Sequence, residues 1–357
     1  MRAVIEGLCA RRDLAEAEAE AVFRELVLGR ISEVELAGLL IALRAKGEAM
    51  PELAGAARAL RDAAEPFPRP EYAFADTCGT GGDGQGTVNL STAAALVAAA
   101  GGVPVAKHGN RAISSRCGSA DVLEAAGAPI DLAPEQARAA LDELGFCFLF
   151  APRYHPGLRH AMPVRRALGV RTILNQLGPL LNPARPPLQV MGVPEPRLVP
   201  MAARALGAVG CEAALVVHGG GLDELALHAP TSAALLRAGH VEEFVIAPED
   251  AGLSRAPLEA LRGGPHEEGA RWLCAALAGD APAAHLDAIA LNAAALFWIA
   301  GRTPDLREGV ALARELLASG AAAARLRAYV EFGIAARDAE RRAEAPSVEE
   351  LAGVAHE

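Results

Sequence analysis

The chain has 357 residues, of which 52% are apolar and 22% are charged, so it is long enough to bury a large core in one or two domains. Aromatic residues make up only 4%, and alanine supplies much of the apolar fraction, which favours closely packed helices over an all-β fold. With 34 basic and 44 acidic residues the formal charge is −10, which argues against general nucleic-acid binding.

Neither the cysteines nor the apolar runs indicate a secreted or membrane-bound protein. The six cysteines are scattered without a C-x-x-C pair, which fits neither a zinc cluster nor a disulfide framework. The N-terminus carries acidic residues too early for a signal peptide. The longest uncharged run, residues 88–106, contains polar residues, paired glycines and Pro104, which is typical of a helix, a turn and a strand. We therefore expect a cytoplasmic protein with no membrane partner.

Residues 1–66 carry only helical patterns and predict a small all-helical domain. Asp13 is the expected cap of one helix, and Ser32 and Glu35 have the spacing of a capping box at the start of the next. The segment 65–72 contains three prolines, which is typical of a linker. A second, larger domain is therefore expected to follow this linker.

Beyond the linker, short apolar runs alternate with helical stretches, which predicts an α/β domain with a mostly parallel central sheet over residues 73–342. A hairpin pattern around Ala238 and Gly239 predicts an antiparallel pair in the same sheet. Helices are expected again from residue 287, and residues 343–357 form a polar tail. The other strands are expected at residues 73–76, 102–109, 146–152 and 213–220.

Residues 79–86, "GTGGDGQG", place five glycines between a strand expected to end at Asp76 and a helix expected to start at Ser91. Backbone N–H groups of such a turn can point at one spot, and the helix N-terminus adds partial positive charge. The loop lacks the Gly-Lys-Ser/Thr of a Walker A motif and is longer than the dinucleotide fingerprint. Taken alone, it is equally consistent with a phosphate or pyrophosphate site and with a structural turn.

A polar segment, residues 106–121, follows the second expected strand. A solvated surface loop is one interpretation. However, ligands collect at the carboxyl ends of strands in open α/β sheets, and cations with hydroxyls and amides suit a second phosphate and sugar hydroxyls. Two anion sites at successive strand ends indicate a ligand with two separated phosphate groups. The polar residues are Lys107, His108, Asn110, Arg111, Ser114, Ser115, Arg116 and Ser119.

Asp223 and Glu224 follow another expected strand, beside flexible glycines. An adjacent pair of carboxylates is usually just solvated. At a strand end the pair could instead hold Mg²⁺, with water and a substrate phosphate completing the coordination shell. Such a cation would explain how an acidic chain tolerates a highly anionic substrate.

The segment 154–184 contains His155, Arg165, Arg166 and Arg171. Arginines on a helix usually form a solvated face, and a histidine before proline is usually a turn residue. The rigid sequence "NQLGPLLNP" in this segment favours a site, since an arginine that faces such a turn could clamp a carboxylate.

Together these stretches resemble the anthranilate phosphoribosyltransferases, in register from the N-terminal helices to about residue 330. The matching blocks are "GTGGDGxxTxNxST", "KHGNRxxSSxxGSADVLEAxG", "YHPxxxxxxxVRRxLGxRTxxNxLGPLxNP", "GLDE" and "LRGG…EE…A". The pyrimidine nucleoside phosphorylases are similar in fold and loop placement but lack the combination of KHGNR and GPLxNP. A phosphorylase-like enzyme and a non-catalytic, nucleic-acid-binding relative are the alternatives, and the acidic charge and retained carboxylates weigh against the second.

The resemblance implies a small helical domain and a large α/β domain of the nucleoside phosphorylase and phosphoribosyltransferase type, with the substrates in the cleft and a homodimer formed through the small domain. It also implies a reaction: phosphoribose passes from 5-phosphoribosyl 1-pyrophosphate (PRPP) to the amine of anthranilate. The products are N-(5-phosphoribosyl)anthranilate and pyrophosphate, in tryptophan biosynthesis. Both substrates are expected partners, and nucleic acid is not.

The resemblance further implies three sets of site residues. PRPP binding falls to Gly79, Gly82, Asp83, Thr87, Asn89, Leu90, Ser91, Thr92, Lys107, His108, Gly109, Asn110, Arg111, Ala112, Ile113, Ser114, Ser115 and Ser119. Anthranilate binding falls to Gly79, His108, Asn110, His155 and Arg165. Mg²⁺, expected as two ions per monomer, falls to Ser91, Asp223 and Glu224. The chain departs from the family pattern at Val88, Leu181 and Gly269, where Phe, Thr and Asn are common.

The chemistry of this reaction agrees with these residue types. An aniline-type nitrogen is neutral at pH 7, so its lone pair is available without a required acid or base residue. The difficult part is to expel pyrophosphate while positive charge develops on the ribose, and metal ions with oriented N–H groups meet that need. Glycines without Cβ atoms would let the loop wrap closely around the pyrophosphate. We expect no covalent intermediate and no catalytic triad.

Overall fold

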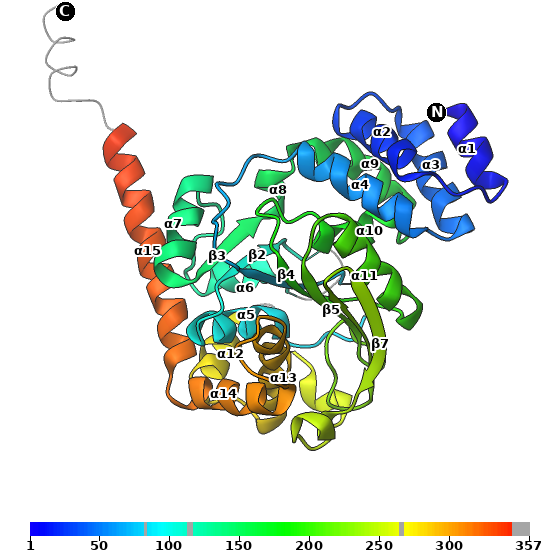
Figure 1. The fold of residues 1–357 in the computed structure, drawn as a ribbon. Coiled ribbons are helices and arrows are strands. Elements are labelled where there is room, and N and C mark those ends of the chain that lie inside the picture. The colour runs from blue at the N-terminus through cyan, green and yellow to red at the C-terminus, as the bar shows by residue number, and fades with distance from the viewer. Residues whose placement is uncertain (82–83, 113–116, 264–267, 345–357) are drawn as a thin grey trace, which may run out of the picture.

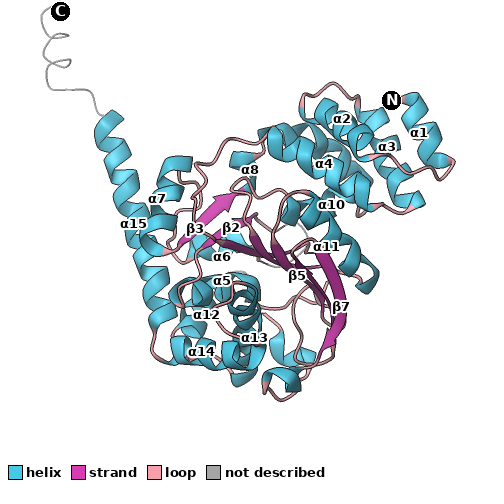
Figure 2. Cartoon of the chain, viewed as in Figure 1, coloured by secondary structure: helices cyan, strands magenta, loops and turns pink. Residues whose placement is uncertain are grey.

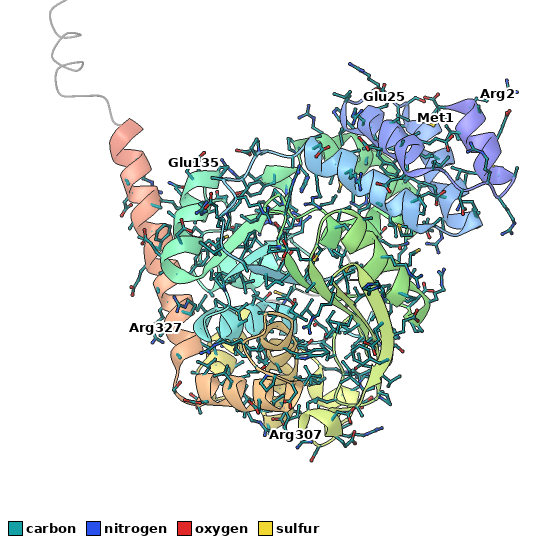
Figure 3. The ribbon with its side chains drawn as sticks, in the orientation of Figure 1. Met1, Arg2, Glu25, Glu135, Arg307 and Arg327 are labelled. Atoms are coloured by element: carbon teal, nitrogen blue, oxygen red, sulfur yellow. The ribbon has the colours of Figure 1, made fainter. Side chains whose placement is uncertain are left out.

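The computed structural model describes residues 1–81, 84–112, 117–263 and 268–344 (Figure 1). A small bundle of helices lies at one end of a larger body in which helices cover a central sheet (Figure 2). Glu25 on the bundle and Arg307 on the opposite side of the body mark these two ends (Figure 3). The expected fold, a helical domain followed by an α/β domain, is confirmed. The expected tail from residue 345 onward lies outside the described residues.

The N-terminal bundle consists of α1 (Arg2–Cys9), α2 (Glu16–Val27), α3 (Glu33–Lys46) and α4 (Met50–Asp62). The expected capping box of α3 is confirmed, since the Ser32 hydroxyl accepts the Glu35 N–H at 3.3 Å and the Glu35 carboxylate accepts the Ser32 N–H at 3.1 Å. The expected Asp13 cap is wrong, because α2 begins only at Glu16. Asp13 instead accepts a hydrogen bond from Lys46 at 2.6 Å, since a buried ammonium needs a carboxylate partner.

The central seven-stranded sheet has the order β3–β2–β1–β4–β5–β6–β7. Strands β1 to β5 are parallel, whereas β6 and β7 are antiparallel neighbours and form the expected hairpin at Ala238 and Gly239. The sheet is therefore mixed. Its strands are β1 (Ala75–Gly79), β2 (Val105–Gly109), β3 (Phe146–Phe150), β4 (Leu188–Gly192), β5 (Ala213–His218), β6 (Thr231–Arg237) and β7 (His240–Ile246).

Two strands differ from those expected. No strand is expected from the sequence at β4, where Gln189 interrupts the apolar run. The Gln189 side chain can be buried there because it donates to the Pro179 carbonyl at 2.7 Å. Strand β1 continues three residues past its expected end at Asp76. Asp76 is tolerated inside the sheet because its carboxylate accepts hydrogen bonds from the Asn182 amide at 2.9 Å and the His108 N–H at 3.3 Å.

In the half of the sheet formed by β4, β5 and β6, the two faces pack into different apolar cores. In β5, Leu215 and Val217 belong to one core and Ala214 and Val216 to the other, as the alternation of side chains along a strand requires. The first core is covered by α5 (Leu90–Ala100), α6 (Ser119–Ala125), α7 (Pro134–Leu144), α8 (Ala151–Tyr154), α12 (Gly269–Leu277), α13 (Ala283–Ile299), α14 (Leu306–Ala318) and α15 (Ala321–Glu344). The second is covered by α9 (Met162–Leu168), α10 (Ile173–Leu177), α11 (Val199–Ala208) and the bundle.

The helices expected from residue 287 onward are confirmed by α13, α14 and α15, and the long helix α15 runs along the outer side of the body (Figure 1). Helix α13 is almost entirely buried because it packs beneath the sheet. Across the described ranges, no helix has the length and apolar character needed to cross a bilayer.

Candidate active site

The candidate site lies at the carboxyl ends of β1 and β4, which are neighbours in the centre of the sheet. The strand order reverses between them, since β2 and β3 lie on one side and β5 on the other. Such a reversal opens a crevice in which ligands bind in open α/β sheets. Gly79 ends β1 opposite Gly192, which ends β4, and the Thr80 N–H donates to the Gly192 carbonyl at 3.0 Å. The glycine-rich loop therefore starts at this crevice.

Asp223 lies directly against the ends of these two strands. Its side chain is buried, and Oδ2 accepts the Gly81 N–H at 2.6 Å. A Cβ atom added to Gly79 would lie 2.1 Å from Asp223 Oδ2, and one added to Gly192 would lie 1.6 Å from the Asp223 carbonyl oxygen. Both positions require glycine because Asp223 occupies the space that a side chain would need. The structure thus brings the glycine loop and a predicted metal ligand together.

Three other positions of the loop require glycine for a different reason. Gly81, Gly84 and Gly86 adopt φ values of +67°, +72° and +63°, and a Cβ atom on any of them would meet nothing within 4 Å. These three positions need glycine for the left-handed backbone conformation, which other residues adopt only at a cost. At Gly79, by contrast, the close approach that excludes a side chain is made by Asp223.

The far end of the glycine loop is held by residues 261–263, the start of the sequence "LRGG". Thr87 pairs with Arg262 in an antiparallel bridge, and the Gly263 N–H donates to the Gly86 carbonyl at 2.9 Å. Asn89, which precedes α5, donates its side-chain amide to a backbone carbonyl before α6 at 3.0 Å. A cavity of about 120 Å³ beside these contacts is lined in part by Thr87, Asn89 and Arg262.

Lys107 links β2 to the start of α5. Its buried ammonium donates to a backbone carbonyl of β1 at 2.5 Å and to the Ser91 hydroxyl at 3.2 Å. Burial raises the pKa of nearby Asp76, and the charge of Lys107 partly offsets that effect. Helix α5 begins at Leu90, one residue before its expected start. The Thr92 hydroxyl is buried and has no hydrogen-bond partner in the described parts of the chain.

His108 and His155 form a buried pair with ring centroids 5.3 Å apart. His108 Nδ1 lies 3.3 Å from the Gly178 carbonyl and His155 Nε2 lies 2.9 Å from the Leu181 carbonyl, so these nitrogens carry the protons that the carbonyls accept. Burial lowers the pKa of His108 to about 3 and that of His155 to about 4, so both rings are neutral. The other nitrogen of each ring is buried without a partner among the residues described. Each ring therefore holds an unprotonated nitrogen in the protein interior.

The segment after β2 is folded back on α6. Gly109 lies so close to Ser119 that a Cβ atom would be 2.3 Å from the hydroxyl oxygen, and this hydroxyl donates to the Asn110 carbonyl at 3.4 Å. Arg111 forms ion pairs with two carboxylates of α6 at 2.6 and 3.2 Å. The Ala112 N–H donates to one of these carboxylates at 2.8 Å. The charge of Arg111 is thus already paired within the protein.

Arg165 has the character of an anion-binding residue. It is half-buried on α9, and the sole hydrogen-bonding contact of its side chain to a described residue is a weak one, 4.0 Å to the Met162 sulfur. Burial lowers the pKa of Arg165, which is the effect of removing a cation from water. Arg166 is exposed, and Arg171 donates to the Gly81 carbonyl at 2.7 Å. The role of Arg171 at the loop was missed because no local pattern indicates which distant carbonyl it reaches.

The donor set at Asp223 fits magnesium. Asp223, Glu224 and Ser91 are all oxygen donors, which Mg²⁺ prefers. Asp223 is oriented by the loop, whereas the Ser91 hydroxyl accepts a hydrogen bond from the Lys107 ammonium at 3.2 Å. Among the described residues, no three His, Cys, Asp or Glu side chains gather as a metal site. Mg²⁺ usually keeps several waters and binds through one or two carboxylates and substrate phosphates. Five predicted site residues lie outside the described ranges: Gly82, Asp83, Ile113, Ser114 and Ser115.

The fold and the site define a two-domain glycosyl transferase. A model of the glycosyl transferase helical bundle domain matches residues 2–64, and a model of the glycosyl transferase family a/b domain matches residues 71–323. A Sorangium cellulosum anthranilate phosphoribosyltransferase is 64% identical over 330 residues, which cover 92% of this chain and 95% of that protein. An Aeromonas salmonicida anthranilate phosphoribosyltransferase is 51% identical, over 87% of this chain and 93% of its own length. The chain therefore belongs to the anthranilate phosphoribosyltransferase family.

Solved structures of this family agree with the fold. The Thermus thermophilus anthranilate phosphoribosyltransferase superposes with a TM-score of 0.87 at 50% identity, over 92% of this chain and 98% of that chain. The Saccharomyces cerevisiae enzyme in complex with PRPP and Mg gives a TM-score of 0.85 at 26% identity, over 93% and 97% of the two chains. The same yeast enzyme in complex with 4-fluoroanthranilate gives 0.83 at 25% identity, over 94% and 99%.

Proposed function

We propose that the chain transfers phosphoribose from PRPP to the amine of anthranilate in tryptophan biosynthesis. The observation that carries the proposal is the packing of Asp223 against Gly79 and Gly81 at the strand-order reversal. This packing joins a metal-binding carboxylate to a phosphate-binding loop in a chain of this family. In the reaction, the bond from ribose C1 to the pyrophosphate oxygen breaks, the amine nitrogen bonds to C1, and the amine loses one proton.

PRPP occupies the carboxyl ends of β1 and β2 in this proposal. The N–H groups of the glycine loop and of the first turn of α5 bind its phosphate oxygens, and Lys107 adds a fixed positive charge. Thr92 supplies a buried hydroxyl that has no other described partner. Asn89 and Ser119 complete the polar lining. The other PRPP-binding residues named from the sequence remain proposed contacts, and among them Arg111 would have to leave its ion pairs with α6 to reach the substrate. Because the N–H donors of the loop and of α5 are already in position, little reorganisation accompanies the departure of pyrophosphate.

Magnesium is held by Asp223 and Glu224 with Ser91, as two ions per monomer. When bound, the metal neutralises charge on the departing pyrophosphate. The Gly81 N–H keeps one Asp223 oxygen in a fixed direction, which supports this assignment. The yeast relative whose structure contains PRPP and Mg supports the use of the same ion here.

Anthranilate lies beside the buried histidine pair, with its carboxylate at Arg165. A half-buried guanidinium with no ion pair in the described structure suits a carboxylate, which can accept two hydrogen bonds from it. His108 and His155 are the proposed neighbours of the substrate ring, and both are neutral because burial lowers their pKa values. Gly79 and Asn110 remain the other proposed contacts. The neutral amine needs no strong base for its attack.

Residues 1–66 form the small domain and residues 73–342 the large one in this proposal, and two copies associate through the small domain. Most apolar residues of α3 are already buried within one chain, including Leu39 and Leu40. Val34 and Ile41 nevertheless remain 84% and 39% exposed, one heptad apart on the same helix face. A second copy of the chain is the proposed cover of this face. A cytoplasmic location also remains a proposal, based on the N-terminal sequence.

The test is the loss of anthranilate fluorescence when PRPP and Mg²⁺ are added to the purified protein. The proposal predicts consumption of anthranilate with release of one pyrophosphate per product molecule. A protein that leaves anthranilate unchanged but cleaves a pyrimidine nucleoside with phosphate would instead be a nucleoside phosphorylase.

A further inference from the structure

Arg171 contacts the glycine loop from the segment 154–184 but is not among the predicted substrate ligands. It lies between α9 and α10, and its Nη1 atom donates to the Gly81 carbonyl at 2.7 Å. The N–H of the same glycine donates to Asp223 Oδ2 at 2.6 Å. The two peptide groups that flank the Gly81 Cα atom are therefore both held, one by Arg171 and one by Asp223.

Gly81 is the residue in this loop that needs such restraint. Its φ is +67°. Because glycine can adopt several other backbone conformations at little cost, its own backbone preference does not hold it in this one. A rotation at Gly81 would turn its N–H away from Asp223. The hydrogen bond from Arg171 opposes that rotation because it fixes the next carbonyl along the chain.

Arg171 is itself held in place by the helical bundle. Arg44, in the last turn of α3, donates through Nη1 to the Arg171 backbone carbonyl. A connected path therefore runs from α3 through Arg171 and Gly81 to Asp223. Nη2 of Arg171 is buried without a hydrogen-bond partner among the described residues. The nearby Glu195 carboxylate has a lowered pKa, chiefly because of Arg197, with smaller contributions from the charges of Arg171 and Arg44.

We propose that Arg171 is a positioning residue that sets the direction of the Asp223 carboxylate, and with it the affinity of the site for magnesium pyrophosphate. The inference rests on the proposed function, because it assigns the metal to Asp223. It predicts an effect on the metal and PRPP side of the reaction and little effect on the affinity for anthranilate.

The test measures binding of inorganic pyrophosphate to the full-length protein by calorimetry, at a series of Mg²⁺ concentrations. Arg171→Met should raise the Mg²⁺ concentration needed for half-maximal binding about tenfold, because one charged hydrogen bond to the loop is lost. Arg171→Lys, which keeps a donor, should recover most of the affinity. The matched control is Arg166→Met, a neighbouring exposed arginine, which should behave as wild type. In kinetics, the KM for PRPP should rise in Arg171→Met while that for anthranilate stays within about twofold.

An Arg171→Met midpoint within twofold of wild type would overturn the inference and leave the proposed function intact. Wild-type protein that binds no pyrophosphate with Mg²⁺ would instead contradict the proposed function. If Arg171→Met does not give a native circular dichroism spectrum, Arg44→Met replaces it, since that change removes the support of Arg171 and spares its side chain. A midpoint for Arg44→Met that equals the wild-type value would then overturn the inference.

Discussion

Gly79 and Asp223 compete for the same space: a Cβ atom on the glycine would lie 2.1 Å from the carboxylate oxygen Oδ2. Gly79→Ala should therefore displace the Asp223 carboxylate and lower kcat/KM for PRPP by about 100-fold, the scale of a 1 Å misplacement in an active site. The matched control is Gly207→Ala in α11, where the new Cβ atom would meet only the side chain of Leu236, at 3.2 Å. Wild-type kinetics for Gly79→Ala with a native circular dichroism spectrum would contradict this account.

Catalysis should require Mg²⁺ through the adjacent carboxylates. Asp223→Asn combined with Glu224→Gln keeps the size of both side chains but removes two negative charges, so most activity should disappear at any Mg²⁺ concentration. Initial rates measured with and without EDTA check this. A double variant that remains fully active in EDTA would exclude the metal assignment.

Variants of Arg165 and Arg166 distinguish specific recognition of the anthranilate carboxylate from a general effect of surface charge. Arg165→Ala should raise the KM for anthranilate by about 10- to 150-fold, which corresponds to the loss of about 1.5–3 kcal/mol from a charged hydrogen bond. The KM for PRPP should change far less. Arg166→Ala is the control because Arg166 is exposed. The assignment is wrong if Arg166→Ala has the anthranilate defect and Arg165→Ala does not.

The neutral histidines should make stability depend on pH. Burial, followed by the neighbouring His155, lowers the pKa of His108 to about 3, whereas an unfolded histidine titrates near 6.5. Between these values the unfolded chain binds more protons, so the free energy of unfolding falls as the pH drops. At pH 5, each such histidine removes about 2 kcal/mol relative to pH 7. Urea unfolding of His108→Gln should therefore show a smaller loss between pH 7 and pH 5 than wild type, and an equal loss would contradict the buried neutral ring.

The exposed face of α3 should form the dimer contact. Val34→Asp with Ile41→Asp places two charges on that face and should convert a dimer into a monomer, because two buried charges without partners are costly. Sedimentation velocity at micromolar concentration measures the change. Ile334→Asp, on a half-exposed side chain of α15, is the control and should leave the oligomeric state unchanged. Wild-type protein that sediments as a monomer would refute the dimer.

Sequence patterns were sufficient where the local signal and the tertiary structure agree. The Ser32 and Glu35 capping box and the β6–β7 hairpin depend on residues close in sequence, and both were predicted. The predictions failed where a distant partner decides the outcome. Asp76 stays inside β1 because Asn182 donates to it, and β4 contains Gln189 because a carbonyl elsewhere accepts its amide.

In the candidate site, too, features set by local sequence were predicted and features set by distant contacts were missed. The position of Asp223 after a strand indicated a ligand from local sequence, but its contact with Gly79 depends on how β1 and β4 pair. Because β4 was not predicted, the strand-order reversal and the reason for the glycine at position 192 were missed as well. The unpaired state of Arg165 also depends on which carboxylates lie elsewhere in the fold.

The core that the bundle shares with the sheet has a consequence for synthesis on the ribosome. Side chains of α2 and α3 are buried in one cluster with residues 161–206 and with β5 and β6. Residues 1–66 emerge before this partner segment, and their apolar face stays uncovered until about 140 further residues are made, which takes about 7–28 s at elongation rates of about 5–20 residues per second. During this interval the nascent bundle would be a target for chaperones that bind exposed apolar segments. Ribosome-bound chains that end before residue 161 should therefore be far more sensitive to protease than chains that extend past β6.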